Sequence, residues 1–301
     1  RSIQNPVILK TIEMNLKGVF EGIELAIKAT ADAQEQLMSH YRKEDRQRFI
    51  NAIRKKTLEN KERMSEMALY ETGMGNLKDK IIKHKVVAEL TPGTEILKTD
   101  AYSGDNGLTI EEMAPFGVIG AITPSTNSSE TIISNSISMI AGGNGVVFNP
   151  HPSAKNTSNF AVDMINKAII EEGGPENLVT SVLNPTLDTV DAMIHHPEIK
   201  LLCGTGGTQL VKKLLSSGKK AIGAGAGNPP VIVDDTADIP KAAKDILDGA
   251  TFDNNIPCIA EKEVFVLEGI ADDLIYYMLQ NGAMIIDRQQ TEALMKIVLT
   301  E

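Results

Sequence analysis

The chain has 301 residues, 42% of them hydrophobic, which is enough to bury the core of one large domain or two ordinary ones. Its 30 Lys and Arg against 40 Asp and Glu give a net charge of −10, which argues against a nucleic-acid-binding surface. No apolar stretch reaches the length of a membrane span, and no signal peptide is visible. The two cysteines make neither a disulfide framework nor a zinc-ligand spacing, so we expect a reducing cytoplasm and no bound metal.

The N-terminal third is predicted to be mostly helical. Helical periodicity runs over residues 19–37, 43–70 and 76–90, and the dense charges of the second stretch are typical of a solvated helix face. A turn at 104–107 precedes a short strand pattern at 108–113.

The pattern then changes to strands that alternate with helices. Continuous apolar runs lie at 116–122, 145–148, 178–183, 199–203 and 220–222. Helical patterns lie between them at 128–141, 153–172, 186–196 and 208–217. This order predicts βαβ units, and apolar runs without alternation predict a parallel sheet that is covered on both faces. Ligands of such sheets bind at the carboxyl ends of the strands.

A second α/β portion follows residue 230. Strand patterns lie at 231–233 and 263–267, and helical patterns at 240–252, 271–280 and 289–300. With two strands against five, this portion is predicted to be an incomplete domain after a complete one.

The stretch 253–258 joins a helical pattern to a strand pattern, and it is polar until it ends at Cys258. A thiol that follows a polar loop is open to a substrate, and the amides of Asn254 and Asn255 could orient one. A structural thiol more often lies within an apolar run. Reactivity depends on the surroundings of the thiolate, so the residues alone leave both roles open.

A glycine-rich segment at 204–207 follows the fourth apolar run and opens a helix. Glycines in that position let backbone amides approach a phosphate at the helix N-terminus. The segment matches neither a Walker loop nor a GxGxxG motif, so a tight turn between strand and helix is the alternative.

Four runs in order resemble the aldehyde dehydrogenase superfamily: APFGVIGAITPSTNSSETI (114–132), VVFNPHPSAK (146–155), GAGAGNPPVIVDDTAD (223–238) and FDNNIPCIAEKEVFV (252–266). Within it they are similar to the CoA-acylating enzymes of bacterial microcompartments, of the ethanolamine- and propanediol-utilisation type. The resemblance implies an α/β, aldehyde dehydrogenase-like fold. Residues 1–227 would form N-terminal helices and a Rossmann-type, NAD-binding parallel-sheet domain. Residues 228–301 would form the first part of the cysteine-bearing catalytic domain.

The implied reaction oxidises a short aliphatic aldehyde, acetaldehyde or propionaldehyde, to its acyl-CoA with reduction of NAD+. Cys258 matches the family's catalytic cysteine, which forms a thiohemiacetal and then a thioester. Asn127 matches the oxyanion-hole asparagine, with the backbone N–H of Cys258 as the second donor. From its residues alone Asn127 has another role open to it, because it precedes a helical run with Glu130 three residues on, as a helix N-cap does.

At two positions this chain departs from the family pattern, and the departures bear on the acyl acceptor and on the choice between NAD and NADP. Hydrolytic members carry a glutamate that activates water where this chain has Ala224, and an alanine cannot act as a base. The acyl group should therefore pass to CoA. Members with a KP motif place a lysine on the adenosine ribose where this chain has Asn149, which carries no charge for a 2′-phosphate and so favours NAD over NADP.

We expect the cofactor to contact the loops that follow the predicted strands. These residues are Thr123, Pro124, Ser125, Asn149, Pro150, His151, Gly204, Thr205, Gly206, Gly207 and Gly225. Cys203, inside an apolar strand, is expected to be a buried structural thiol.

The resemblance also implies a homo-oligomer, a dimer or tetramer, and packing inside a microcompartment shell, although residues 1–18 show no clear encapsulation helix. Chains of the family continue for well over a hundred residues more, so we expect a C-terminally truncated sequence. Two rival hypotheses are a hydrolytic aldehyde dehydrogenase that makes the carboxylic acid, and a truncated, inert nucleotide-binding module.

Overall fold

The computed structural model describes residues 16–298. The chain divides into two compact units, with the boundary between Ala226 and Gly227. The sequence prediction placed this boundary one residue later, and the functions assigned to the two units remain predictions.

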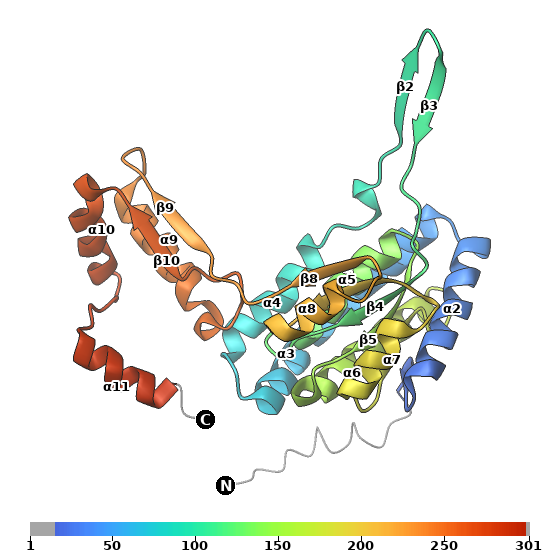
Figure 1. Ribbon diagram of the computed structural model, residues 1–301, viewed down its shortest axis with the longest axis horizontal. Helices are drawn as coiled ribbons and strands as arrows, with labels where there is room; N and C mark the ends of the chain where they lie inside the picture. Colours follow the sequence, from blue (N-terminus) through green and yellow to red (C-terminus); the bar gives the residue numbers. More distant parts are fainter. Residues whose placement is uncertain (1–15, 299–301) are drawn as a thin grey trace. The chain divides into compact units, whose positions relative to one another are not determined.

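The first unit is built on a six-stranded sheet, one strand more than predicted, and every pairing in it is parallel, as expected (Figure 1). In spatial order the strands are β1 (Val19–Phe20), β6 (Val179–Val182), β5 (Gly145–Asn149), β4 (Val118–Ile122), β7 (Ile199–Thr205) and β8 (Ala221–Ala224).

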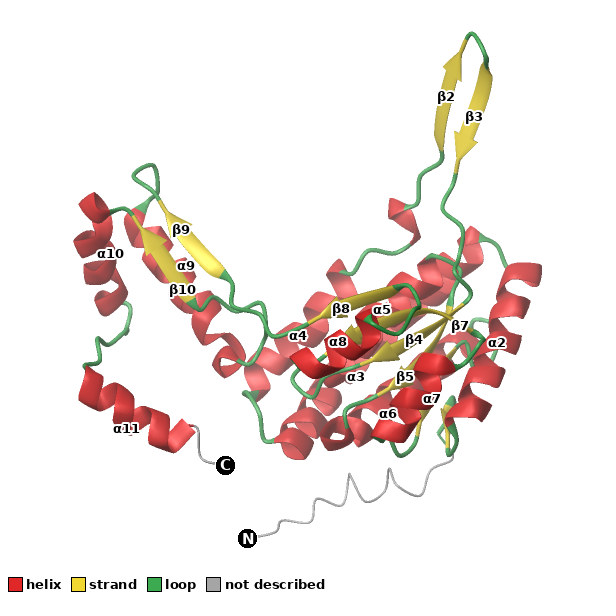
Figure 2. Cartoon of the chain, viewed as in Figure 1, coloured by secondary structure: helices red, strands yellow, loops and turns green. Residues whose placement is uncertain are grey.

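Helices cover both faces of this sheet, because its central strands are apolar on both sides (Figure 2). Along β4, Ile119 and Ala121 join one core cluster, whereas Val118 and Ile122 join the other. The first face packs against α3 (Lys43–Thr72), α5 (Ser128–Ala141) and α6 (Lys155–Glu171), the last preceded by a 3₁₀ turn, η2 (Pro152–Ala154). The second packs against α2 (Ile23–His40), α7 (Leu187–His195) and α8 (Thr208–Leu215). The predicted helices and the covered sheet are thus confirmed.

The prediction that a helix begins at Val19 is wrong. Val19 and Phe20 form β1, and α2 begins at Ile23. The strand is held by distant partners, since Ser181 N–H donates to the Gly18 carbonyl at 2.9 Å and Leu183 N–H to the Phe20 carbonyl at 2.7 Å. Local periodicity carries no information about such pairing.

A hairpin of β2 (Asp100–Gly104) and β3 (Gly107–Glu111) extends between α4 (Leu77–Leu90), with its following turn η1 (Thr94–Ile96), and β4. Only the second strand and the turn were predicted. All ten residues are exposed, so β2 shows none of the apolar alternation that marks a half-buried strand.

The second unit pairs β9 (Pro230–Val233) with β10 (Glu263–Val266) in parallel. Its helices are α9 (Ile239–Thr251), α10 (Glu268–Gln280) and α11 (Arg288–Val298). One face of the strand pair packs against α9 and α10, but Ile232 and Phe265, on the other, are 80% and 58% exposed. Within the described residues the strand pair is therefore covered on one face only.

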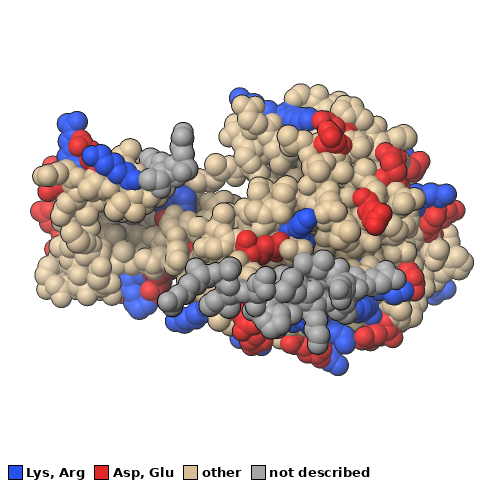
Figure 3. All heavy atoms as spheres, turned by 90° about the horizontal axis from the view of Figure 1, so that it is seen from below, with Lys and Arg blue, Asp and Glu red and all other residues tan. Residues whose placement is uncertain are grey.

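The surface carries both signs of charge. On the face drawn in Figure 3, basic and acidic side chains are interspersed instead of gathering into one basic area. Among the described helices, none combines the length and the apolar character that crossing a membrane requires.

Phe148 on β5 tests the core of the first unit because its ring is fully buried between the sheet and the helices. Replacing Phe148 by Ala should lower the free energy of unfolding by about 3–5 kcal/mol, through lost burial and a cavity. The matched variant Phe116→Ala removes a half-exposed ring and should cost less than about 1 kcal/mol. Urea unfolding checks both, and equal losses would contradict the described core.

Candidate active site

The loops predicted to hold a cofactor meet along one edge of the sheet. In the strand register Ile122 pairs with Asn149 on one side and with Gly204 on the other. Thr123 N–H also donates to the Asn149 carbonyl at 3.4 Å. The ends of β5, β4 and β7 therefore form one row, and β8 continues it through the pair Thr205 and Ala224.

This row lies where the direction of the chain across the sheet reverses. After β4 the chain adds β5 and β6 on one side, then crosses back to place β7 on the other. Loops diverge at such a switch point, and this is where ligands of open parallel sheets bind.

Two buried oxygens at this edge lack hydrogen-bond partners within the described residues. They are Thr123 Oγ1, directly after β4, and Asn149 Oδ1, at the end of β5. The other amide atom of Asn149 is occupied, since Nδ2 donates to Thr189 Oγ1 at 2.9 Å, and the side chain is only 1% exposed. Buried polar atoms usually have partners, so this edge has bonding capacity left for a polar ligand.

The remaining predicted contacts of these two loops differ in exposure. Pro124 and Ser125 are half-buried and Pro150 is buried. His151 is exposed, and its Nδ1 accepts from Ser153 N–H at 3.2 Å.

The glycine segment makes a tight connection between β7 and α8. A Cβ on Gly204 would lie 2.1 Å from Leu214 Cδ1, and one on Gly206 2.8 Å from Leu210 Cδ2. Gly207 is the N-cap of α8, and Gly225, after β8, is exposed with no atom within 4 Å of an added Cβ. The turn alternative is thus observed, and a phosphate contact remains a prediction that this geometry permits.

A separate cavity of about 680 Å³ lies at the opposite, amino ends of β4 and β7, where Gly117, Val118 and Lys200 line it. His196 and Glu24 also line the cavity, and His196 Nε2 lies 2.9 Å from Glu24 Oε2. It is therefore not the predicted cofactor site.

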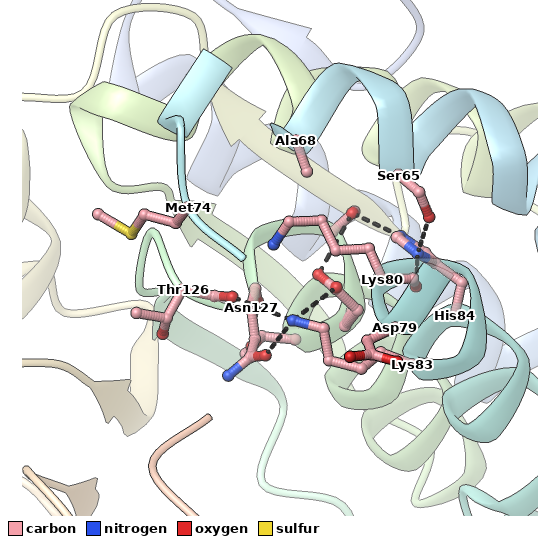
Figure 4. Close-up of polar contacts among 12 residues, drawn as sticks. Ser65, Ala68, Met74, Asp79, Lys80, Lys83, His84, Thr126 and Asn127 are labelled. Atoms are coloured by element: carbon pink, nitrogen blue, oxygen red, sulfur yellow. Dashed lines mark hydrogen bonds and ion pairs between the residues drawn. The ribbon is translucent and has the colours of Figure 1, made fainter. Parts of the chain in front are cut away.

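Asn127 occupies the N-cap position of α5, but its side chain makes no capping hydrogen bond. Its Oδ1 instead accepts from Lys83 Nζ of α4 at 2.9 Å (Figure 4). Its Nδ2 has no partner among the described residues, and the side chain is half-buried. The alternative of a capping side chain is thus not realised, and one N–H donor group remains available.

Helix α4 turns two lysines and a histidine inward. Lys80, Lys83 and His84 are buried together with Ala88, whereas Ile82 and Val86 are exposed. The sequence analysis assigned none of these residues a role, because buried stripes are expected to be apolar. The spacing of Lys80, Lys83 and His84 on one helix face was the signal that could have found them.

The buried basic side chains of α4 face the first turn of α5. Lys83 Nζ lies 3.3 Å from Glu130 Oε1, and their side chains are 10% and 5% exposed. His84 Nε2 hydrogen-bonds Ser129 Oγ at 2.8 Å. Burial alone would raise the pKa of Glu130, but the charges of His84, Lys83 and Lys80 outweigh it and hold that pKa below its ordinary value.

The second unit carries Cys258 after a turn of unusual backbone. Asp253, Asn254 and Asn255 all have positive φ, at 46°, 57° and 60°. Asn255 fastens the turn, since Nδ2 donates to the Ala250 carbonyl at 2.6 Å and Oδ1 accepts from Lys262 Nζ at 2.7 Å. Asparagine and aspartate tolerate this conformation better than most residues.

The thiol of Cys258 is half-buried on this loop. A Cβ on Gly227 would lie 2.1 Å from the Cys258 carbonyl oxygen, so the loop requires glycine there. Cys258 and Asn127 belong to different units, so their cooperation is part of the proposal below.

The sequence analysis also singled out Cys203 and Ala224, both of which lie in the sheet of the first unit. Cys203 lies in β7 and packs partly buried against the core, and burial raises the pKa of its thiol, as suits the structural role predicted for it. Ala224 ends β8 and is exposed.

Comparison with known proteins identifies the class of this fold and site. The aldehyde dehydrogenase family matches residues 3–289, so the chain belongs to that family. Among curated relatives, an acetaldehyde dehydrogenase (acetylating) of Bilophila wadsworthia is 48% identical over 283 residues, 94% of this chain and 58% of that protein.

Two solved structures are similar over 94% of this chain and 65% of theirs. One is a propionaldehyde dehydrogenase from the Clostridium phytofermentans fucose utilisation bacterial microcompartment, at 55% identity and a TM-score of 0.90. The other is a Rhodopseudomonas palustris propionaldehyde dehydrogenase with bound CoA and an acylated cysteine, at 52% identity and 0.89. The resemblance to acylating enzymes is confirmed, and the chain spans about three fifths of these relatives' length.

The ion pair of Glu130 with Lys83 predicts that the stability of the fold depends on pH. The pKa of Glu130 is lower in the folded protein than its ordinary value of 4.5. The stabilisation that ionised Glu130 gives the fold is therefore fully present above pH 4.5 and is lost as pH falls through the folded pKa. Glu130→Gln should lower the free energy of unfolding by about 3 kcal/mol at pH 7 and flatten its decrease below pH 4.5. Urea unfolding at pH 7 and 4 checks this, and an unchanged acid slope would contradict it.

The close contact of Gly227 with the Cys258 backbone predicts that a side chain at position 227 would displace the loop that carries Cys258. On the prediction that Cys258 is the nucleophile of the full-length protein, Gly227→Ala should displace the Cys258 backbone and slow NADH formation by about tenfold or more, because small displacements of a reacting group are costly. The control Gly269→Ala, in α10, meets no atom within 4 Å and should leave the rate unchanged. Stopped-flow absorbance at 340 nm gives both rates, and equal rates would show that the loop tolerates a side chain.

Proposed function

We propose that the full-length protein oxidises a short aliphatic aldehyde, acetaldehyde or propionaldehyde, to its acyl-CoA with reduction of NAD+. The observation that carries this proposal is the 52% identity to a propionaldehyde dehydrogenase with bound CoA and an acylated cysteine. The four motifs, the half-buried thiol of Cys258 and the spare donor group of Asn127 support it residue by residue.

The first step is attack of the Cys258 thiolate on the aldehyde carbonyl. A carbon–sulfur bond forms and the carbonyl π pair moves to oxygen, giving a thiohemiacetal oxyanion. Asn127 Nδ2 and the backbone N–H of Cys258 donate hydrogen bonds to that oxygen. Removing one such donor typically slows the reaction about 10²–10³-fold.

The residues at the sheet edge fit a dinucleotide. Thr123 Oγ1 and Asn149 Oδ1 have bonding capacity left, and Gly225 leaves open space beside its backbone. When bound, NAD+ would accept a hydride from the thiohemiacetal carbon, so that this C–H bond breaks while the oxyanion re-forms the carbonyl and leaves an acyl thioester on Cys258. Asn149 contributes no charge, so we propose NAD over NADP.

Release of the acyl group depends on which nucleophile can reach the thioester. Ala224 offers no base for water. A thiol such as that of CoA ionises closer to neutral pH and needs less help. Attack by the CoA thiolate forms a new thioester and expels the Cys258 thiolate, which restores the enzyme.

Two further parts of the proposal concern the assembled protein. We propose a homo-oligomer, a dimer or tetramer, and packing inside a bacterial microcompartment in the cytoplasm. The similar structure from a fucose utilisation microcompartment supports the second part. Residues 1–15, where an encapsulation helix was sought, lie outside the described residues.

The test is NADH production by the full-length protein with propionaldehyde, with and without CoA. Sustained turnover should require CoA, and Cys258→Ala should abolish it, since no other group replaces the attacking sulfur. The matched variant Cys203→Ala, at the partly buried thiol, should keep the wild-type rate.

The other outcomes decide between the rivals. Equal turnover without CoA, with release of the carboxylic acid, would establish the hydrolytic enzyme. Equally slow alkylation of Cys258 and Cys203, with no NADH, would establish an inert nucleotide-binding module.

A further inference from the structure

We infer that Lys83 is a positioning residue that fixes the side-chain amide of Asn127 in the orientation an oxyanion donor needs. The inference rests on the proposed role of Asn127. It is carried by the contact of a buried ammonium group with the amide oxygen at 2.9 Å (Figure 4).

The Lys83 ammonium is enclosed by oxygens from one loop and one helix turn. Lys83 is 8% exposed, and Nζ donates to Asn127 Oδ1 at 2.9 Å and to the Thr126 carbonyl at 3.3 Å. Glu130 Oε1 lies 3.3 Å away and supplies the opposite charge. The lysine thus ties α4 to the loop between β4 and α5, on both sides of Asn127.

Charge determines which way the Asn127 amide points. An ammonium group has three donors and no acceptor, so it can bond the amide oxygen but not the amide NH2. Rotating the amide by 180° would bring two partly positive groups together and break the bond. Nδ2 is therefore held away from Lys83, where it has no partner within the described residues.

The same contact strengthens Nδ2 as a donor. A hydrogen bond from a cation to an amide oxygen withdraws electron density from the amide nitrogen, and linked hydrogen bonds reinforce one another where the surroundings are poor in water. Lys83 would thus act on the oxyanion through Asn127, without touching it.

Burying an ion pair is weak evidence for stability, because apolar residues of similar size often pack as well. Glu130 offsets part of the cost of burying Lys83, and the N-terminus of α5, which favours negative charge, stabilises the Glu130 carboxylate. The arrangement is therefore better explained by what the ammonium does for Asn127, whose amide oxygen it bonds.

The experiment measures the single-turnover rate of NADH formation in the full-length protein. Lys83→Met alone leaves a buried carboxylate unpaired, so the variant to compare is Lys83→Met with Glu130→Gln. Its rate should fall about 10–100-fold, no further than that of Asn127→Ala, with the KM for aldehyde changed by less than about threefold.

A double-mutant cycle separates positioning from a general structural effect. In the Asn127→Ala background, adding the two substitutions should slow the reaction by less than about twofold, since the amide they position is gone. A wild-type rate in the Lys83 and Glu130 variant, or an equal loss in both backgrounds, would overturn the inference.

Lys167→Met is the matched control for lost stability. Lys167 pairs with the buried carboxylate of Asp163 at 2.7 Å in α6. Among the described residues no hydrogen bond links this pair to Asn127. The substitution should lower Tm and leave the rate unchanged.

A readout without turnover separates this inference from the proposed function. The side-chain ¹⁵N–¹H signals of Asn127, identified by their loss in Asn127→Ala, should shift and broaden when Lys83 is replaced. If the wild type forms no NADH, the proposed function fails while this signal still decides the positioning role. An unchanged signal would overturn that role.

Discussion

The pairing of β4 with β5 on one side and β7 on the other is the interaction on which the first unit depends. It is parallel on both sides, so three strands end at one edge and leave their carboxyl-terminal loops next to one another. Residues from three distant stretches of sequence thereby reach a single row. The apolar runs that build these strands need helices on both faces, which leaves this edge as the place where polar groups can meet a ligand.

A second constraint is the burial of basic side chains beside that edge. Helix α4 places Lys83 and His84 in the interior. In the first turn of α5, Glu130 pairs with Lys83 and Ser129 hydrogen-bonds His84. The packing of α4 against α5 must therefore supply oxygen atoms around the buried ammonium group, because a buried charge without such partners is costly. One of those oxygens belongs to the amide proposed to act on the substrate, so the scaffold and the site share one polar cluster.

Much of the fold could be predicted from the sequence. Continuous apolar runs indicated the strands, and the four family motifs carried the candidate residues. What could not be predicted depends on partners distant in sequence. Val19 is a strand residue because β6 lies beside it, and Lys83 is buried because Glu130 neutralises it. Local periodicity assigned the first to a helix and gave the second no role.

The left-handed turn before Cys258 has a consequence for adapting this protein to heat. Glycine would adopt the backbone of Asp253, Asn254 and Asn255 with less strain, which is on the order of 1 kcal/mol for each residue. The side chain of Asn255 would then be lost, and with it the bonds to Ala250 and Lys262 that brace the loop. Because the loss of those two bonds offsets the strain that is relieved, the gain in heat tolerance would be small, and the backbone before Cys258 would be held less firmly.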